Sequence, residues 1–308
     1  MIFLVGAILL ASFFSIIFKV CQKYGIDSSH VIIINYFTAF AATMLPIGIR
    51  LFTGTAVPDD YSLQGSSYLF AAVQGILFVT GFTIMDYSIW RSGVALTTIS
   101  ARASLIIPVI LGWMLLSQPA PKWGPVALII ISMALIVLTN DIQRHDGVKV
   151  SDKSDEQRRR RAVILLIAVF ACYGVSDFNM KLSQNSVQTF IAPGQDAGTH
   201  FAALMGMIFL SATIVSIVPM MLKDKQKKQP FSYKSVIGGL ALGLVNIFCT
   251  SCSLRALSVL STDIYYPLYN IGIVIVATLA GVVFFKEKIK WPQYVGIALA
   301  IVAIILFF

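Results

Sequence analysis

The sequence predicts an all-α polytopic membrane protein whose ten transmembrane helices form two inverted five-helix repeats. Three observations support this fold class. Hydrophobic residues make up 57% of the 308 residues and charged residues only 12%, against about 25% charged residues in soluble domains. The chain also contains ten long apolar segments, and its two halves carry matching sequence signals. A chain with so few polar side chains cannot cover itself with a water-facing surface, so we expect most of it to lie in lipid.

The apolar segments have the length of membrane spans, since crossing a hydrocarbon core of ~30 Å takes about 20 mostly apolar residues. Turn-forming stretches such as 58–60 and 119–121 separate several of them. The alternating pattern of a membrane β-barrel is absent, which favours helices. No basic region precedes the first segment, so we expect it to be retained as a span. The ten segments are 1–20, 30–50, 67–88, 92–116, 124–140, 162–182, 200–222, 235–255, 260–285 and 291–308.

Basic residues set the expected orientation. Most of the 23 Lys and Arg residues lie in or beside the odd-numbered loops, and positive loops stay in the cytoplasm. We therefore expect both termini outside and a location in the inner (cytoplasmic) membrane. Residues 141–161 form a charged cytoplasmic linker whose run Arg158–Arg161 binds anionic lipid headgroups or anchors the topology. The net charge of +9 then reflects orientation, and we expect no nucleic acid partner.

The halves 1–140 and 162–308 resemble each other. Residues 18–22 read FKVCQ and residues 180–184 read MKLSQ, at the end of the first span of each half. Gly112, Gln118 and Ala127 correspond to Gly281, Glu287 and Gly296 at one fixed offset. Each half contains an odd number of spans, so the second copy enters the membrane from the opposite side. Inverted repeats of this kind are typical of carriers with a solute site near the midplane.

Segments 93–138 (GVALTTISARASLIIPV…) and 256–306 (ALSVLSTDIYYPLYN…) both resemble the second part of an EamA repeat of the drug/metabolite transporter superfamily. The resemblance implies a ten-helix carrier of small organic solutes, often an exporter, with a central cavity. The sequence departs from the repeat at Gln118, where a glutamate is common. It also departs at four charged residues placed where the repeat is usually apolar or small: Asp86, Arg102, Asp177 and Asp263.

Arg102 lies in the middle of an apolar run, in the stretch SARASLIIP. Ten residues into the fourth span, at about 1.5 Å per residue, it is expected about 15 Å deep. A charge there facing lipid costs from about 3 to over 10 kcal/mol, so we expect Arg102 to face the cavity together with Thr98, one turn before it. Two interpretations stay open. Arg102 binds an anionic group of the solute, or it pairs permanently with a protein carboxylate.

Further polar residues complete the predicted site. Tyr266, Tyr269 and Asn270 on the ninth span, with Asn246 and Ser176, are expected to bind the solute, although the tyrosines also fit an interfacial aromatic belt. Asp177 is the candidate for proton coupling. Gating pairs are predicted near the two membrane surfaces, with interfacial snorkelling or simple solvation as the alternatives. The gating residues are Lys181 and Asp263 outside, and Lys19 and Asp86 inside.

The function predicted from these features is secondary transport of a small polar organic metabolite, anionic or zwitterionic such as an amino acid, by alternating access. Proton-coupled export is the expected mode, and the lipid bilayer, the solute and protons are the expected partners of a monomer or homodimer. The alternatives are a membrane-embedded lipid-modifying enzyme and an exporter of cationic drugs. An enzyme is not expected, because no Ser/His/Asp set or Gly-rich phosphate loop is visible. We also expect no cofactor and no metal, since Cys249 and Cys252 lack further ligands.

Overall fold

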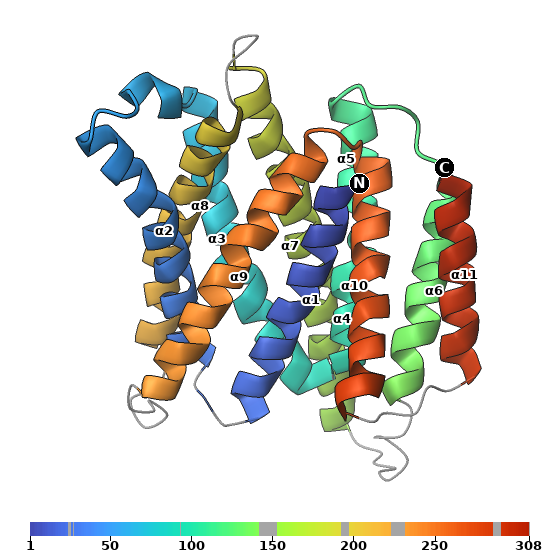
Figure 1. Cartoon of the computed structure of the whole chain (residues 1–308). Coiled ribbons are helices and arrows are strands. Elements are labelled where there is room, and N and C mark those ends of the chain that lie inside the picture. Colours follow the sequence, from blue (N-terminus) through green and yellow to red (C-terminus); the bar gives the residue numbers. More distant parts are fainter. Residues whose placement is uncertain are drawn as a thin grey trace. The chain divides into compact units, whose positions relative to one another are not determined.

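A computed structural model describes residues 1–23, 26, 28–92, 94–141, 153–191, 197–222, 232–285 and 291–307. Its regular structure within these residues is helical, and no strand occurs among them (Figure 1). The predicted all-α class is confirmed. The helices are α1 (Ile2–Lys23), α2 (Ser28–Phe52), α3 (Gly65–Ser92), α4 (Val94–Ala103), α5 (Ile106–Leu115), α6 (Trp123–Asp141), α7 (Lys153–Gln188), α8 (Ala197–Leu222), α9 (Tyr233–Leu257), α10 (Thr262–Phe285) and α11 (Trp291–Phe307), with the short 3-10 helix η1 (Pro58–Tyr61).

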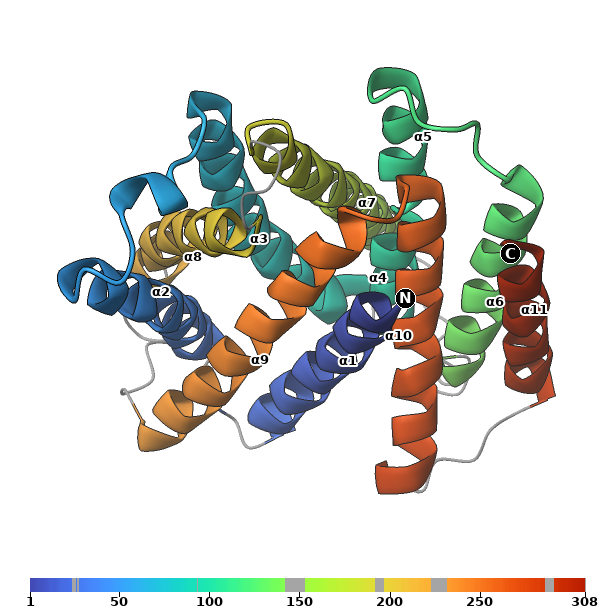
Figure 2. The same ribbon diagram turned by 45° about the horizontal axis from the view of Figure 1, so that its top comes forward.

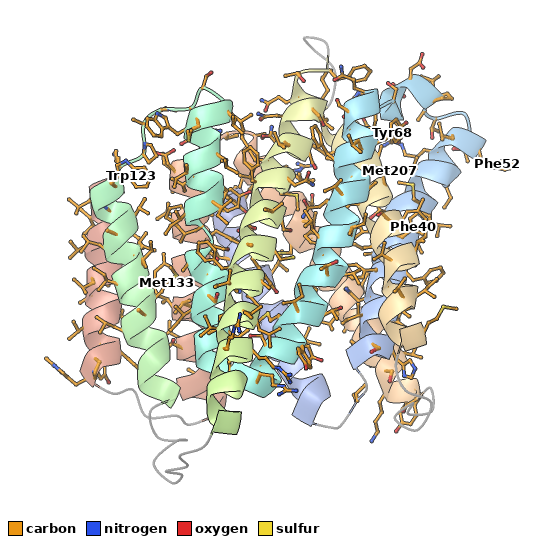
Figure 3. The ribbon with its side chains drawn as sticks, turned by 180° about the vertical axis from the view of Figure 1, so that it is seen from behind. Phe40, Phe52, Tyr68, Trp123, Met133 and Met207 are labelled. Atoms are coloured by element: carbon orange, nitrogen blue, oxygen red, sulfur yellow. The ribbon has the colours of Figure 1, made fainter. Side chains whose placement is uncertain are left out.

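Within the described residues, 7 helices are long and apolar enough to cross a membrane. The other three predicted spans contain shorter apolar helices, at Ile2–Phe13, Trp123–Leu135 and Trp291–Leu306. Large apolar side chains are exposed along these helices; Phe52, at the end of α2, is 93% exposed (Figure 3). Such side chains are stable against lipid rather than water. The protein is therefore a multi-pass membrane protein, while the count of ten spans and their inversion stay predictions.

The chain folds into two compact units, each built from segments of both predicted repeats. Unit 1 comprises Met1–Val79 and Asn179–Val259, and unit 2 comprises Thr80–Phe178 and Leu260–Phe308. In unit 1, α9 packs against α1 and α2, and α2 also packs against α8. In unit 2, α6 and α11 run side by side (Figure 2). The helices α3 and α7 each contribute residues to both units.

Small residues allow the helices of unit 1 to approach closely. A Cβ atom on Gly239 of α9 would lie 2.5 Å from Ile34 Cβ of α2, and one on Gly243, a turn later, would lie 2.6 Å from Thr38 Cβ. A Cβ on Gly75 of α3 would lie 2.5 Å from the backbone nitrogen of Ala212 in α8. Helices in lipid gain little from hydrophobic burial, so van der Waals contact at small residues holds them together.

Unit 2 contains a break inside a segment that the sequence predicts as one span, residues 92–116. Two helices, α4 and α5, replace it, with a turn at Ser104–Leu105. Pro108 explains the break, because proline has no N–H to donate to the carbonyl of residue 104 and its ring clashes there. That carbonyl instead accepts the backbone N–H of Ile107 at 2.9 Å. Arg102 consequently lies one residue before the end of α4 rather than inside a continuous helix.

We predict that replacing Gly75 with alanine destabilises the protein. Overpacking of this kind costs about 1–3 kcal/mol, which exceeds the gain of about 1 kcal/mol in helix propensity at most sites. The measurement is the apparent melting temperature of the purified protein in detergent.

Gly48→Ala is the matched control, since a Cβ on Gly48 of α2 would meet no atom within 4 Å. Its melting temperature should stay unchanged or rise. Equal effects of the two substitutions would contradict the close contact between α3 and α8.

Candidate functional site

The candidate site lies in unit 2, where α4, α7 and α10 meet. Its core is a polar cluster formed by Arg102 of α4, Asn270 and Tyr266 of α10, and Asp177 of α7. Ser100 of α4 also donates a hydrogen bond of 2.6 Å to the carbonyl of Leu166 in α7. The sequence predicts all four residues of the polar cluster as functional, and the structure brings them together.

Arg102 binds the side-chain amide of Asn270. Its Nη1 donates to Asn270 Oδ1 at 3.2 Å, while Asn270 Nδ2 donates to the carbonyl of Tyr266 at 3.0 Å. The amide is therefore oriented with its oxygen toward the guanidinium. Asn270 is buried, whereas Arg102 is only half-buried. Among the described residues, Arg102 makes this bond and forms no ion pair with a carboxylate.

Asp177 stands close to Arg102 without pairing with it. The hydroxyl of Tyr266 donates to the backbone carbonyl of Asp177, which fastens α10 to α7. The half-buried Asp177 carboxylate lies within electrostatic range of the Arg102 guanidinium. Tyr173, one turn earlier on α7, donates its hydroxyl to the Sδ atom of Met85 at 2.9 Å. The cluster thus contains a guanidinium on α4 and an acid on α7, whose helices are connected through hydrogen bonds of α10.

The tyrosines of α10 pack on one another. The rings of Tyr265 and Tyr269 are stacked with centroids 5.3 Å apart, and Tyr265 meets Tyr266 edge to face at 5.0 Å. Tyr265 and Tyr266 are buried, and Tyr269 is half-buried. Such ring pairs add about 0.5–1.5 kcal/mol beyond the area they bury. The ring cluster therefore stiffens the part of α10 that presents Tyr266 and Asn270.

Gln118 fixes the beginning of α10. Its Oε1 accepts hydrogen bonds from the backbone N–H of Thr262 at 2.9 Å and from the Thr262 hydroxyl at 2.6 Å. Gln118 thereby satisfies one of the N–H groups that have no intrahelical partner at the helix N-terminus. Asp263 follows in the first turn and is 6% exposed. Its Oδ1 has no hydrogen-bond partner among the described residues, and the helix N-terminus compensates its charge in part.

The remaining predicted residues lie in different settings. Thr98 is half-buried one turn before Arg102, and Ser176 is buried beside Asp177. Asp86 is half-buried on α3 in unit 2. Lys19 belongs to α1, but its side chain lies outside the described residues.

Asn246 and Lys181 belong to unit 1 and have partners there. Asn246 Nδ2 donates to Asn35 Oδ1 at 3.4 Å. Lys181 Nζ is buried and donates to Gln184 Oε1 at 2.7 Å and to the carbonyl of Leu257 at 2.6 Å. The last carbonyls of a helix carry partial negative charge, so the end of α9 stabilises the ammonium group.

Sequence reasoning missed several of these contact residues. Met85 and Ser100 show no sequence signal, because one is apolar and the other is a small hydroxyl residue within a span. Gln118 is signalled by its departure from the EamA pattern, although its role as a helix cap is not. Within the described residues, no three His, Cys, Asp or Glu side chains gather as a metal site would require.

Apolar spans around buried charged and aromatic side chains define a multi-pass α-helical membrane protein. Residues 160–308 match the EamA-like transporter family. The predicted resemblance is confirmed there, and the family implies a transporter rather than an enzyme.

Two further similarities extend over almost the whole chain. An uncharacterized protein of Haemophilus influenzae is 25% identical over 304 residues, which is 98% of this chain and 95% of the relative. A protein of known crystal structure has a TM-score of 0.70 at 12% sequence identity, covering 99% of this chain and 95% of its own. At that identity, the second similarity establishes a shared fold alone.

We predict that Gln118→Leu destabilises the protein and that Gln118→Glu does not. Leucine removes the acceptor at the N-terminus of α10, and a lost cap costs about 0.5–2 kcal/mol. Glutamate keeps the acceptor and adds a negative charge, which helix N-termini favour.

Apparent melting temperatures of the two variants in detergent test this prediction, with Gln118→Glu as the matched control. Similar losses in both variants would show that Gln118 does not act through its acceptor oxygen.

Proposed function

We propose that the protein is a secondary transporter that moves a small polar organic solute with an anionic or zwitterionic group across the cytoplasmic membrane by alternating access. The observation that carries this proposal is the guanidinium of Arg102, which lies among the spans of an EamA-related chain with a neutral amide as its hydrogen-bond partner.

The guanidinium is suited to an anionic solute. Its planar set of N–H donors matches a carboxylate or phosphate, and the bond to Asn270 uses only Nη1. Because that partner is neutral, its oxygen does not cancel the positive charge. Arg102 is half-buried, so the donors that have no partner among the described residues are accessible to a solute.

Coupling and gating are further parts of the proposal. Asp177 is the proton-coupling carboxylate, since a half-buried acid beside the Arg102 charge can respond to both proton and solute. Lys181 and Asp263 gate the outer side, and Lys19 and Asp86 gate the inner side. Both termini then lie outside, and transport runs outward as export.

The two alternatives receive less support. An exporter of cationic drugs could use Asp263 and the stacked pair Tyr265 and Tyr269, but the Arg102 charge in the same unit repels cations. A lipid-modifying enzyme does not agree with the transporter family that residues 160–308 match.

We predict that Arg102→Gln reduces solute counterflow in proteoliposomes by about 10- to 100-fold at low solute concentration. This loss corresponds to one charge-assisted interaction of about 1.5–3 kcal/mol. The measurement screens labelled amino acids, organic acids, sugar phosphates and organic cations with wild type and variant.

Two controls sharpen this experiment. Arg102→Lys keeps the charge without the planar donors and should give intermediate flux. Arg50→Gln removes an equal charge from an exposed residue at the end of α2 and should match wild type. Wild-type flux in Arg102→Gln would contradict the role of Arg102, and absence of saturable flux for every solute would contradict transport itself.

We also predict that Asp177→Asn uncouples transport from protons. At saturating solute, counterflow without a pH gradient should persist, because the solute can still exchange. An imposed pH gradient should no longer accelerate flux, since an amide cannot carry a proton. The readouts are solute flux and the internal pH of the vesicles.

Asp60→Asn provides the matched control, because it removes a carboxylate from the exposed helix η1. A gradient response in Asp177→Asn equal to that of wild type would exclude Asp177 as the coupling residue.

A further inference from the structure

We propose that α1 is the moving helix of unit 1, and that it shifts lengthwise along α9 during the transport cycle while α7 keeps its position on α3. This inference rests on the proposed transport function and assigns its conformational change to one pair of helices. The reason is a chemical difference between two helix pairs that correspond to each other in the predicted repeat.

The two pairs have equivalent positions in the sequence. The helices α1 and α7 carry the matching stretches FKVCQ and MKLSQ and are the first spans of the two predicted halves, while α3 and α9 are the third spans. Each first span lies against the third span of the other half. The helix α1 packs against α9 (Figures 1 and 2), and hydrogen bonds connect α7 to α3. A difference between these pairs therefore indicates which of them can move.

The pair α3 and α7 has one fixed register. The hydroxyls of Ser67 and Ser186 are hydrogen-bonded at 2.8 Å. Asn179 Nδ2 donates to Gln74 Oε1 at 2.8 Å and to the carbonyl of Phe70 at 2.9 Å. The four polar side chains are buried, and the two side-chain bonds lie seven residues apart on each antiparallel helix. A lengthwise shift would break both bonds and leave buried polar groups without partners, which is costly inside a membrane.

The contacts between α1 and α9 depend much less on direction. Cys249 Sγ lies 3.7 Å from the carbonyl oxygen of Ala7, and a thiol is a weak donor. A Cβ atom on Gly6 would lie 3.2 Å from Cys252 Sγ. Contacts of polarizable sulfur with small residues are held by dispersion, which has no preferred direction and can be exchanged for similar contacts nearby. The helix α1 can therefore change its register on α9 at little loss.

The remaining contact of this pair can follow such a shift. The Arg255 guanidinium lies 5.5 Å from the centroid of the Phe3 ring. Arg255 is exposed, and its long flexible side chain can stay over the ring while α1 moves.

A disulfide that fixes α1 on α9 tests the proposal. A Cβ on residue 6 would lie 3.9 Å from Cys252 Cβ, and disulfides require about 3.5–4.5 Å. Air oxidation of Gly6→Cys in proteoliposomes, catalysed by copper phenanthroline, should form this bond, and mass spectrometry of the peptides measures its yield. Oxidation should lower solute counterflow at least about 10-fold, and dithiothreitol should restore it, because a carrier that cannot change conformation does not turn over. The probes are the labelled amino acids, organic acids, sugar phosphates and organic cations of the flux screen.

Two controls accompany this variant. Gly6→Cys combined with Cys252→Ser cannot form the bond and should keep its flux under the same oxidation. Ser67→Cys combined with Ser186→Cys places a disulfide where two hydroxyls are 2.8 Å apart. It connects the pair that we expect to stay fixed, so its flux after oxidation should match its flux in the reduced state.

A second measurement uses the unaltered chain and does not depend on the folding of Gly6→Cys. Cys252 lies beside Gly6 of α1, and Cys172 of α7 lies beside Gly81 of α3, where a Cβ would be 3.6 Å from its Sγ. Both cysteines are half-buried. A membrane-permeable maleimide should label Cys252 faster during solute exchange than without solute, while the labelling rate of Cys172 should not change. Peptide mass spectrometry measures the two rates in one sample.

The outcomes separate this inference from the proposed function. Undiminished flux in the fully crosslinked Gly6→Cys variant, or equal changes in labelling at Cys252 and Cys172, would overturn the shift of α1 and leave transport intact. Loss of flux on crosslinking residues 67 and 186 would show that α7 also moves on α3. Failure of wild type to transport any solute of the panel would instead refute the proposed function.

Discussion

The interaction on which the site depends is the hydrogen bond between Arg102 and Asn270. A guanidinium cannot lose its charge inside a membrane, so the surrounding helices must provide polar groups for it. The break after Ala103 places Arg102 near the C-terminal carbonyls of α4, which carry partial negative charge. Asn270 contributes the direct contact from α10. Tyr266 then connects α10 to the backbone of Asp177 in α7.

In the described residues, several charged side chains and helix termini are stabilised by helix ends and side-chain amides rather than by carboxylates. Lys181 donates hydrogen bonds to Gln184 and to a carbonyl at the end of α9. Gln118 accepts a backbone N–H at the beginning of α10. Removing one partner of a buried ion pair destabilises a protein by about 3–5 kcal/mol, because the other charge stays buried without compensation. Neutral partners avoid that penalty, and in the proposed transporter they leave the charge of Arg102 available to a solute.

The sequence predicts the helical segments well because length and hydropathy determine them locally. It also singles out Arg102, Asp177 and Asn270, since charges and amides are expensive in lipid wherever they point. The partners of these residues depend on which helix faces meet, and one unaligned sequence contains no record of that. The Arg102 guanidinium therefore binds an amide, and the sequence alone could not distinguish this partner from a carboxylate.

Other features have a local signal whose meaning depends on packing. Pro108 permits the break between α4 and α5, yet Pro46 and Pro267 lie inside continuous helices, so proline alone does not determine where a helix ends. Gly75 and Gly48 are both helical glycines, but only Gly75 has a neighbouring helix within contact of a Cβ. The two glycines are identical in residue type, and the presence or absence of a neighbouring helix decides the effect of an added Cβ at each.

A carrier must bind its solute and also release it, so in the proposed transporter a neutral partner for Arg102 is useful. A protein carboxylate bonded to the guanidinium would compete with an anionic solute as an equal, and breaking that pair would oppose every binding event. The Asn270 amide contributes a weaker, uncharged hydrogen bond, so a solute carboxylate gains energy by taking its place or joining it. Asn270 also stays bonded to Tyr266, which keeps the site formed when the solute leaves. In the proposed mechanism the polar cluster thus orients Arg102 while leaving its charge unsatisfied between transport steps.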